Sequence, residues 1–172
     1  MSTLATNIQH HPPLSLHQES SVIKNCLSNS IVSRPATSQL RLSYNCLPCS
    51  PPTLLSTLTT LPDLSILHYS GHGTDSFLTI ENDDGSTIPV DGAHLSSLLS
   101  KRRSMGPGQT NLKIVFISAC QSQKIAQSFV DYGIPHVIAV DSNTAVLDST
   151  ARVFAEVFYQ TLLSGMSVQT GE

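Results

Sequence analysis

Two apolar runs, "LSILHYSGHG" at residues 64–73 and "LKIVFISAC" at residues 112–120, decide the fold of this chain. The second run is β-branched, aromatic and continuously apolar, which is typical of a parallel strand buried on both faces of a sheet. The first run stops abruptly at a histidine, His72, set between two glycines. Each run therefore predicts a buried strand that leads directly into a reactive side chain.

Helical patterns alternate with these strands. Leu40, Leu42 and Tyr44 have the period of two that predicts a strand within residues 39–47. Ser50 is a suitable N-cap for a helix that starts at Pro51 and stops near Pro62, before the run at 64–73. A strand, a helix and a strand within about 30 residues form a βαβ unit, so we expect these strands to be parallel.

The remaining elements are expected from turn and capping signals. The pair Asp84-Gly85 predicts a hairpin between strands at 77–81 and 86–90. Asp91 then caps a helix, a second helix runs from about residue 122 to Gly133, a buried strand covers 136–140, and a last helix covers 148–163. This order predicts an α/β domain with a mainly parallel sheet and helices on both faces.

Composition sets the domain boundaries and the broad class of the chain. The first 38 of its 172 residues are rich in Ser, His, Pro, Asn and Gln without a sustained period, so we expect a disordered segment at 1–38 and one folded domain at 39–172. The formal net charge of −3 and the single basic cluster, Lys101-Arg102-Arg103, argue against a nucleic-acid-binding protein. No apolar run is long enough to span a membrane, and four sparse cysteines favour a reducing, cytoplasmic setting.

His72 and Cys120 are the two residues that carry the predicted chemistry. Parallel neighbouring strands would bring both to the same edge of the sheet, where an imidazole can accept the proton of a cysteine nucleophile. The backbone N–H groups of Gly73 and Cys120 would hold the oxyanion of a tetrahedral intermediate. Gly71 and Gly73 also permit a sharp turn with positive φ. This chemistry requires no metal and no organic cofactor.

Two other readings of the cysteines and histidines remain open. Cys46 and Cys49 form a C-x-x-C pair, which suits a redox motif or half of a zinc site, but no second pair occurs and chance is the simpler explanation. A zinc site built from His68, His72, His94 and Cys120 has no support in their spacing.

The segment "HYSGHG", followed roughly 50 residues later by "VFISAC", resembles the caspase-like cysteine peptidases and, more closely, the CHAT domain. The resemblance extends from about residue 39 to the C-terminus. It implies a three-layer sandwich, with His72 as the general base, Cys120 as the nucleophile, Gly73 as an oxyanion donor and His68 as a structural residue. It also implies a protein or peptide substrate, and repeat or NTPase segments elsewhere in a larger parent chain.

The sequence departs from the family pattern at several positions. The run Cys120-Gln121-Ser122 lacks the glycine that caspases have two residues after the cysteine, and Ser118 occupies a position that lines the substrate pocket. Asp141 either makes that pocket acidic, which would favour a basic P1 residue, or is a turn residue. The family fold also has a strand and a helix before residue 39, which residues 1–38 do not obviously supply, so we expect an N-terminally incomplete sheet.

The sequence therefore predicts a cysteine-type endopeptidase that uses a Cys-His dyad. A catalytically weak or inactive peptidase-derived module for protein interaction or signalling is the alternative, because the missing glycine and the short N-terminus leave it open.

Overall fold

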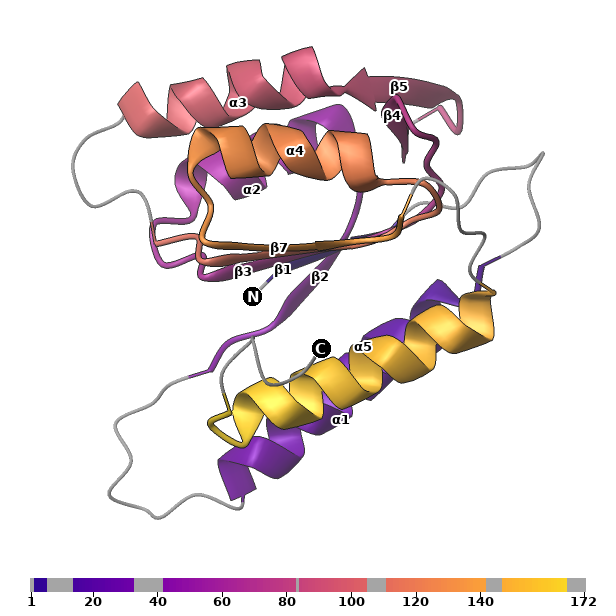
Figure 1. Cartoon of the computed structure of the whole chain (residues 1–172), viewed down its shortest axis with the longest axis vertical. Helices are drawn as coiled ribbons and strands as arrows, with labels where there is room; N and C mark the ends of the chain where they lie inside the picture. The colour runs from indigo at the N-terminus through magenta and orange to yellow at the C-terminus, as the bar shows by residue number, and fades with distance from the viewer. Residues whose placement is uncertain are drawn as a thin grey trace.

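A five-stranded parallel sheet forms the middle layer of the molecule (Figure 1). In the computed structural model, which describes residues 2–5, 14–32, 42–82, 84–104, 111–141 and 147–166, every neighbouring pair of its strands is parallel. Their spatial order is β2 (Asn45–Pro48), β1 (Ser2–Ala5), β3 (Ile66–Ser70), β6 (Ile114–Ser118) and β7 (His136–Ala139). The two runs that decide the fold thus become the adjacent strands β3 and β6.

Helices cover both faces of this sheet. On one face lie α2 (Pro51–Thr60), α3 (Gly92–Ser104) and α4 (Gln123–Tyr132); on the other lie α1 (Leu16–Val32) and α5 (Asp148–Leu163), which pack against each other (Figure 1). A hairpin of β4 (Phe77–Glu81) and β5 (Thr87–Asp91) forms a separate antiparallel pair. The architecture is the α/β fold expected from the sequence and is compatible with a caspase-like sandwich.

Each face of the sheet has its own apolar core. Alternate residues of β3 and β6 point to opposite faces, as the period of a strand requires. Leu67 and Val115 contribute to the core under α2, α3 and α4, whereas Ile114 and Phe116 pack against α1 and α5. Burial on both faces explains why these two strands read as continuous apolar runs rather than as alternating ones.

The capping and turn signals are confirmed. Ser50 caps α2, accepting a hydrogen bond from the N–H of Thr53, and Asp91 accepts one from the N–H of His94 at 2.9 Å in the first turn of α3. Gly133 ends α4 in the left-handed region with φ of 98°, where the absence of a Cβ removes the steric cost. Gly85 has φ of 78° in the hairpin turn.

The structure differs from the expectation of disorder over residues 1–38 and of an N-terminally incomplete sheet. Residues 2–5 form β1, which lies between β2 and β3, and residues 16–32 form α1. The pattern of α1 is hidden in the sequence because its buried face mixes Ile23, Cys26 and Leu27 with the buried polar residues Glu19 and Ser30. A four-residue strand such as β1 is too short to show a period.

The predicted strand at 39–47 is displaced toward the C-terminus. Strand β2 begins at Asn45, and residues 39–41 lie outside the described part of the chain. β2 pairs with β1 instead of β3, so the βαβ unit encloses an additional strand. Within the described ranges, no helix combines the length and the apolar character needed to cross a membrane.

Candidate active site

The chain segments that carry His72 and Cys120 leave the sheet side by side. Strands β3 and β6 are paired so that Ser70 lies opposite Ser118, and His72 and Cys120 each follow two residues later. The N–H of Gly71 donates to the carbonyl oxygen of Ser118 at 3.1 Å, which extends the pairing past the end of β3. Both residues therefore emerge at the carboxyl edge of the sheet, where ligands of parallel sheets bind.

Gly73 lies directly against the backbone of Cys120. A Cβ atom at Gly73 would come within 3.3 Å of the carbonyl oxygen of Cys120 and 3.1 Å of the Cβ of Ala119. Neither Gly71 nor Gly73 adopts the positive φ that a glycine permits. The glycine at position 73 is explained instead by this close approach of the two segments.

The backbone around His72 is fixed by hydrogen bonds. The carbonyl oxygen of His72 accepts bonds from the buried Tyr69 hydroxyl at 2.9 Å and from the N–H of Thr79 at 3.0 Å. An exposed ion pair between Lys124 of α4 and Asp75, 2.7 Å long, links the segment after His72 to the helix after Cys120. The side chain of His72 is half-buried, and that of Cys120 is exposed to solvent.

The segment after Cys120 has no glycine, and the structure supplies a reason. Ser122 occupies the position of the family glycine with a negative φ of −83°. Its buried hydroxyl accepts a hydrogen bond from the N–H of Val140 at 3.1 Å, which ties this segment to the end of β7. The unusual conformation lies one residue earlier, at Gln121, whose φ of 54° is in the left-handed region.

A cavity of about 290 Å³ opens beside this edge, and both predicted pocket residues line it. Ser118 lies at the end of β6, and Asp141 follows β7, where its side chain is exposed. The other lining residues are mostly apolar and come from β6, β7 and the first turns of α5: Phe116, Ile117, Ile138, Ala139, Val140, Thr150, Ala151 and Phe154. The cavity has the apolar walls and few polar groups typical of a binding pocket.

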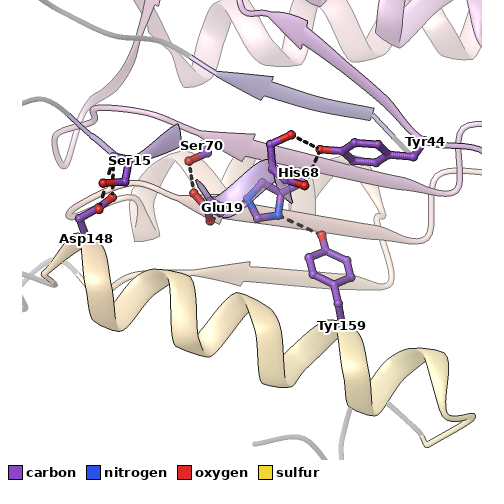
Figure 2. Close-up of polar contacts among 8 residues, drawn as sticks. Ser15, Glu19, Tyr44, His68, Ser70, Asp148 and Tyr159 are labelled. Carbon is purple, nitrogen blue, oxygen red and sulfur yellow. Dashed lines mark hydrogen bonds and ion pairs between the residues drawn. The ribbon is translucent and has the colours of Figure 1, made fainter. Parts of the chain in front are cut away.

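A buried polar network lies on the α1 and α5 side of the sheet (Figure 2). Nε2 of His68 donates to the Glu19 carboxylate at 3.2 Å, and Nδ1 of His68 is 3.0 Å from the Tyr159 hydroxyl. The hydroxyl of Ser70 also donates to Glu19. His68 is fully buried and stacks on Phe116, with 4.6 Å between ring centroids.

The environment sets the ionisation of this network. Burial raises the pKa of Glu19, but hydrogen bonds from His68, Ser70 and Ser118, with the attraction of His68, outweigh it, so the pKa lies below its usual value. Burial and the nearby charge of Glu19 raise the pKa of Tyr159 well above its ordinary value. Glu19 is therefore a carboxylate, and Tyr159 keeps its hydroxyl proton.

Sequence reasoning assigned a structural role to His68 but missed Glu19 and Tyr159. Glu19 lies in the segment expected to be disordered, and its partners are far along the chain. Tyr159 falls within the apolar pattern of the last predicted helix, where an aromatic residue reads as core. The one available sign of the network was a lone glutamate among the apolar residues of α1. That sign could be used only if residues 16–32 were first predicted to be a helix.

The redox and zinc readings find no support in the geometry. Cys46 is exposed while Cys49 is buried, and burial raises the pKa of the Cys49 thiol to about 12, which leaves it protonated. His68 is enclosed by Glu19 and Tyr159, whereas His94 is exposed beside Asp91. In the described ranges, no three histidine, cysteine or acidic side chains are grouped to hold a metal ion.

Comparison with curated protein sequences gives no match for the chain. The model of the CHAT domain family, a caspase-like, peptidase-related domain, matches residues 18–171, which include most of α1 and both predicted catalytic residues. With a strand-end histidine and a strand-end cysteine on adjacent parallel strands, and with nearly its whole length matched, this chain belongs to the CHAT domain family.

Proposed function

We propose that the chain is a cysteine-type endopeptidase that hydrolyses peptide bonds with a Cys120–His72 dyad. The observation that carries the proposal is the pairing of β3 with β6, which delivers the two segments to one edge and brings Gly73 against the backbone of Cys120. This juxtaposition is what a nucleophile and its base require.

Each residue has a defined role in the reaction. The thiol proton of Cys120 passes to the imidazole of His72, and the sulfur attacks the carbonyl carbon of the peptide bond. The N–H groups of Gly73 and Cys120 stabilise the resulting oxyanion. The intermediate collapses to a thioester as His72 protonates the departing amine, and a water molecule then hydrolyses the thioester and regenerates the thiol.

The cavity lined by Ser118 and Asp141 is the proposed site for the substrate side chain that precedes the cleaved bond. Its apolar walls suit an aliphatic stem, and Asp141 at its rim supplies a negative charge. A lysine or arginine side chain combines these two features, because its stem is apolar and its end is cationic. We therefore propose protein or peptide substrates with a basic P1 residue.

The dyad is tested by labelling of Cys120 with a chloromethyl ketone that carries an arginine side chain. Intact protein and the His72→Ala variant are treated side by side, and the labelled cysteine is located by mass spectrometry. The rate should fall strongly in His72→Ala, and Asp141→Asn should weaken the preference for an arginine probe over a leucine probe. Equal labelling by two folded proteins would refute the dyad.

The cellular setting is proposed from the cysteines and the family. All four cysteines are in described residues and none forms a disulfide, which suits a reducing cytoplasm. Repeat or NTPase segments of a larger parent chain are the proposed intramolecular partners. Thiol titration of the protein purified without reductant checks the first point.

An interaction module without peptidase activity is the second candidate, favoured by the outer surface of α5. Val153 and Val157 lie one turn apart on this helix and are 58% and 54% exposed. Exposed apolar residues grouped in this way often mark a protein contact. Cleavage of a peptide library that stops in Cys120→Ala would exclude this candidate as the sole function.

A further inference from the structure

The two chain segments that carry His72 and Cys120 each begin at a serine. Ser70 ends β3 and Ser118 ends β6, and the two residues are directly paired in the sheet. A single residue separates Ser70 from His72, and a single residue separates Ser118 from Cys120. A change in the spacing of the serines would therefore be passed directly to the proposed dyad.

One buried carboxylate lies beside this pair of serines. Glu19 reaches them from α1: its carboxylate accepts a hydrogen bond from the hydroxyl of Ser70, and Ser118, the sheet partner of Ser70, lies near enough to lower the pKa of Glu19. Figure 2 shows Glu19 between Ser70 and His68, with Tyr159 reaching the same histidine from α5. Glu19 is 4% exposed, so water does not compete for these contacts.

The remaining contacts of Glu19 fix the direction of its carboxylate. His68 donates to one oxygen, Oε1, while Ser70 donates to the other, Oε2. Charge-assisted hydrogen bonds of this kind are stronger than neutral ones, and a buried carboxylate with several donors has little freedom to turn. The carboxylate is thus a fixed point at the paired ends of two strands: it holds Ser70 directly, and Ser70 is paired with Ser118.

We propose that Glu19 is a positioning residue that holds the ends of β3 and β6 together and thereby sets the approach of His72 to Cys120. The proposal rests on the dyad function proposed above. It makes α1 part of the active site's support, although Glu19 touches neither a substrate nor a reacting atom. Misplacement by about 1 Å is enough to cost roughly 100-fold in rate at such a site.

The test compares Glu19→Gln with Tyr159→Phe in the full chain. The first variant keeps the size of residue 19 but removes its charge and supplies an amide where the serines need an acceptor. The second removes a buried hydrogen bond at the other end of the same network without touching Ser70 or Ser118. Ser70→Ala, which deletes one donor and no buried charge, is the milder variant if Glu19→Gln fails to fold.

Two measurements separate positioning from stability. The first is amide hydrogen exchange at Gly71, whose N–H bonds to Ser118, relative to amides in the centre of β6. The second is the rate of Cys120 alkylation by iodoacetamide, with and without His72→Ala in each background. In Glu19→Gln we expect Gly71 exchange to rise about tenfold relative to β6 and the His72-dependent acceleration to fall by at least about tenfold. Tyr159→Phe should change neither ratio, and Ser70→Ala should change both in the same direction but less.

The outcomes distinguish this proposal from the peptidase proposal. If the exchange rate of the Gly71 amide relative to the centre of β6 is unchanged in Glu19→Gln, Glu19 does not hold the strand ends together. If Glu19→Gln does not fold, the same result in Ser70→Ala leads to the same conclusion. If the relative exchange rate of Gly71 rises but His72 still accelerates the alkylation of Cys120 as in the wild type, Glu19 does not position the dyad. If His72→Ala has no effect even in the wild-type chain, the peptidase proposal fails, and the Gly71 ratio alone then decides whether Glu19 holds the strands.

Discussion

Deleting the hydroxyl group of Tyr159 tests the energetic importance of the buried network. Tyr159 is fully buried, and its hydroxyl is 3.0 Å from Nδ1 of His68. Tyr159→Phe keeps the ring contacts with Phe116 and Phe158 but leaves a buried nitrogen without this partner. An unsatisfied buried polar group costs about 1–3 kcal/mol. For a chain of this length, a loss of about 2 kcal/mol lowers Tm by roughly 4–8 °C.

Tyr44→Phe is the matched control because it deletes the same atom from a contact with α1 on the same side of the sheet. The hydroxyl of Tyr44 is 2.8 Å from the hydroxyl of Ser20, at a half-buried position where water can replace it. We expect this variant to lose less than about 1 kcal/mol. Chemical and thermal unfolding of both variants gives the comparison. Equal losses would refute the argument that burial makes the His68–Tyr159 bond costly to break.

Four further expectations follow from individual residues. Gly73→Ala should lose about 1–3 kcal/mol in urea unfolding, because its Cβ crowds Ala119, and slower labelling of Cys120 should accompany the loss. Gln121→Gly should gain up to about 1 kcal/mol in the same assay, since relief of the left-handed strain exceeds the added entropy of the unfolded chain; a loss would contradict this account. Because the pKa of Glu19 is lowered by folding, its stabilising contribution is present above about pH 4.5 and is lost as pH falls through the folded pKa, so melting curves of the wild type and Glu19→Gln should converge on acidification. In native protein at about pH 8, iodoacetamide should spare Cys49, whose pKa is about 12, and should modify it only after denaturation.

The central strands could be predicted from sequence because their patterns are local. Strand β6 is buried on both faces and therefore consists of uninterrupted apolar residues, and α2 begins with a serine cap and two prolines. The positions of His72 and Cys120 followed from the same strands, because a parallel pairing places their ends at one edge. Local patterns were sufficient wherever a residue's role depended on its own strand or helix.

The N-terminal elements could not be predicted because their stability comes from distant partners. Strand β1 has four residues and is held by β2 and β3 on either side. Helix α1 packs against α5, at the opposite end of the chain, and buries polar residues that a hydrophobic pattern excludes. Glu19 reads as a surface residue until its contacts with Ser70 and His68, about 50 residues away, are known.

The cost of burying Glu19 is itself an argument about its role. Removing a carboxylate from water is unfavourable, and replacement of a buried ionic group by well-packed apolar residues is often neutral or stabilising by about 1–4 kcal/mol. Stability alone would therefore be served equally well by an apolar side chain on this face of α1. An apolar side chain, however, has no acceptor for the hydroxyl group of Ser70, which is paired with Ser118, and dispersion contacts do not fix a direction. The carboxylate is distinguished from an apolar residue by its ability to fix the relative position of two strand ends, and these are the strand ends that lead to His72 and Cys120.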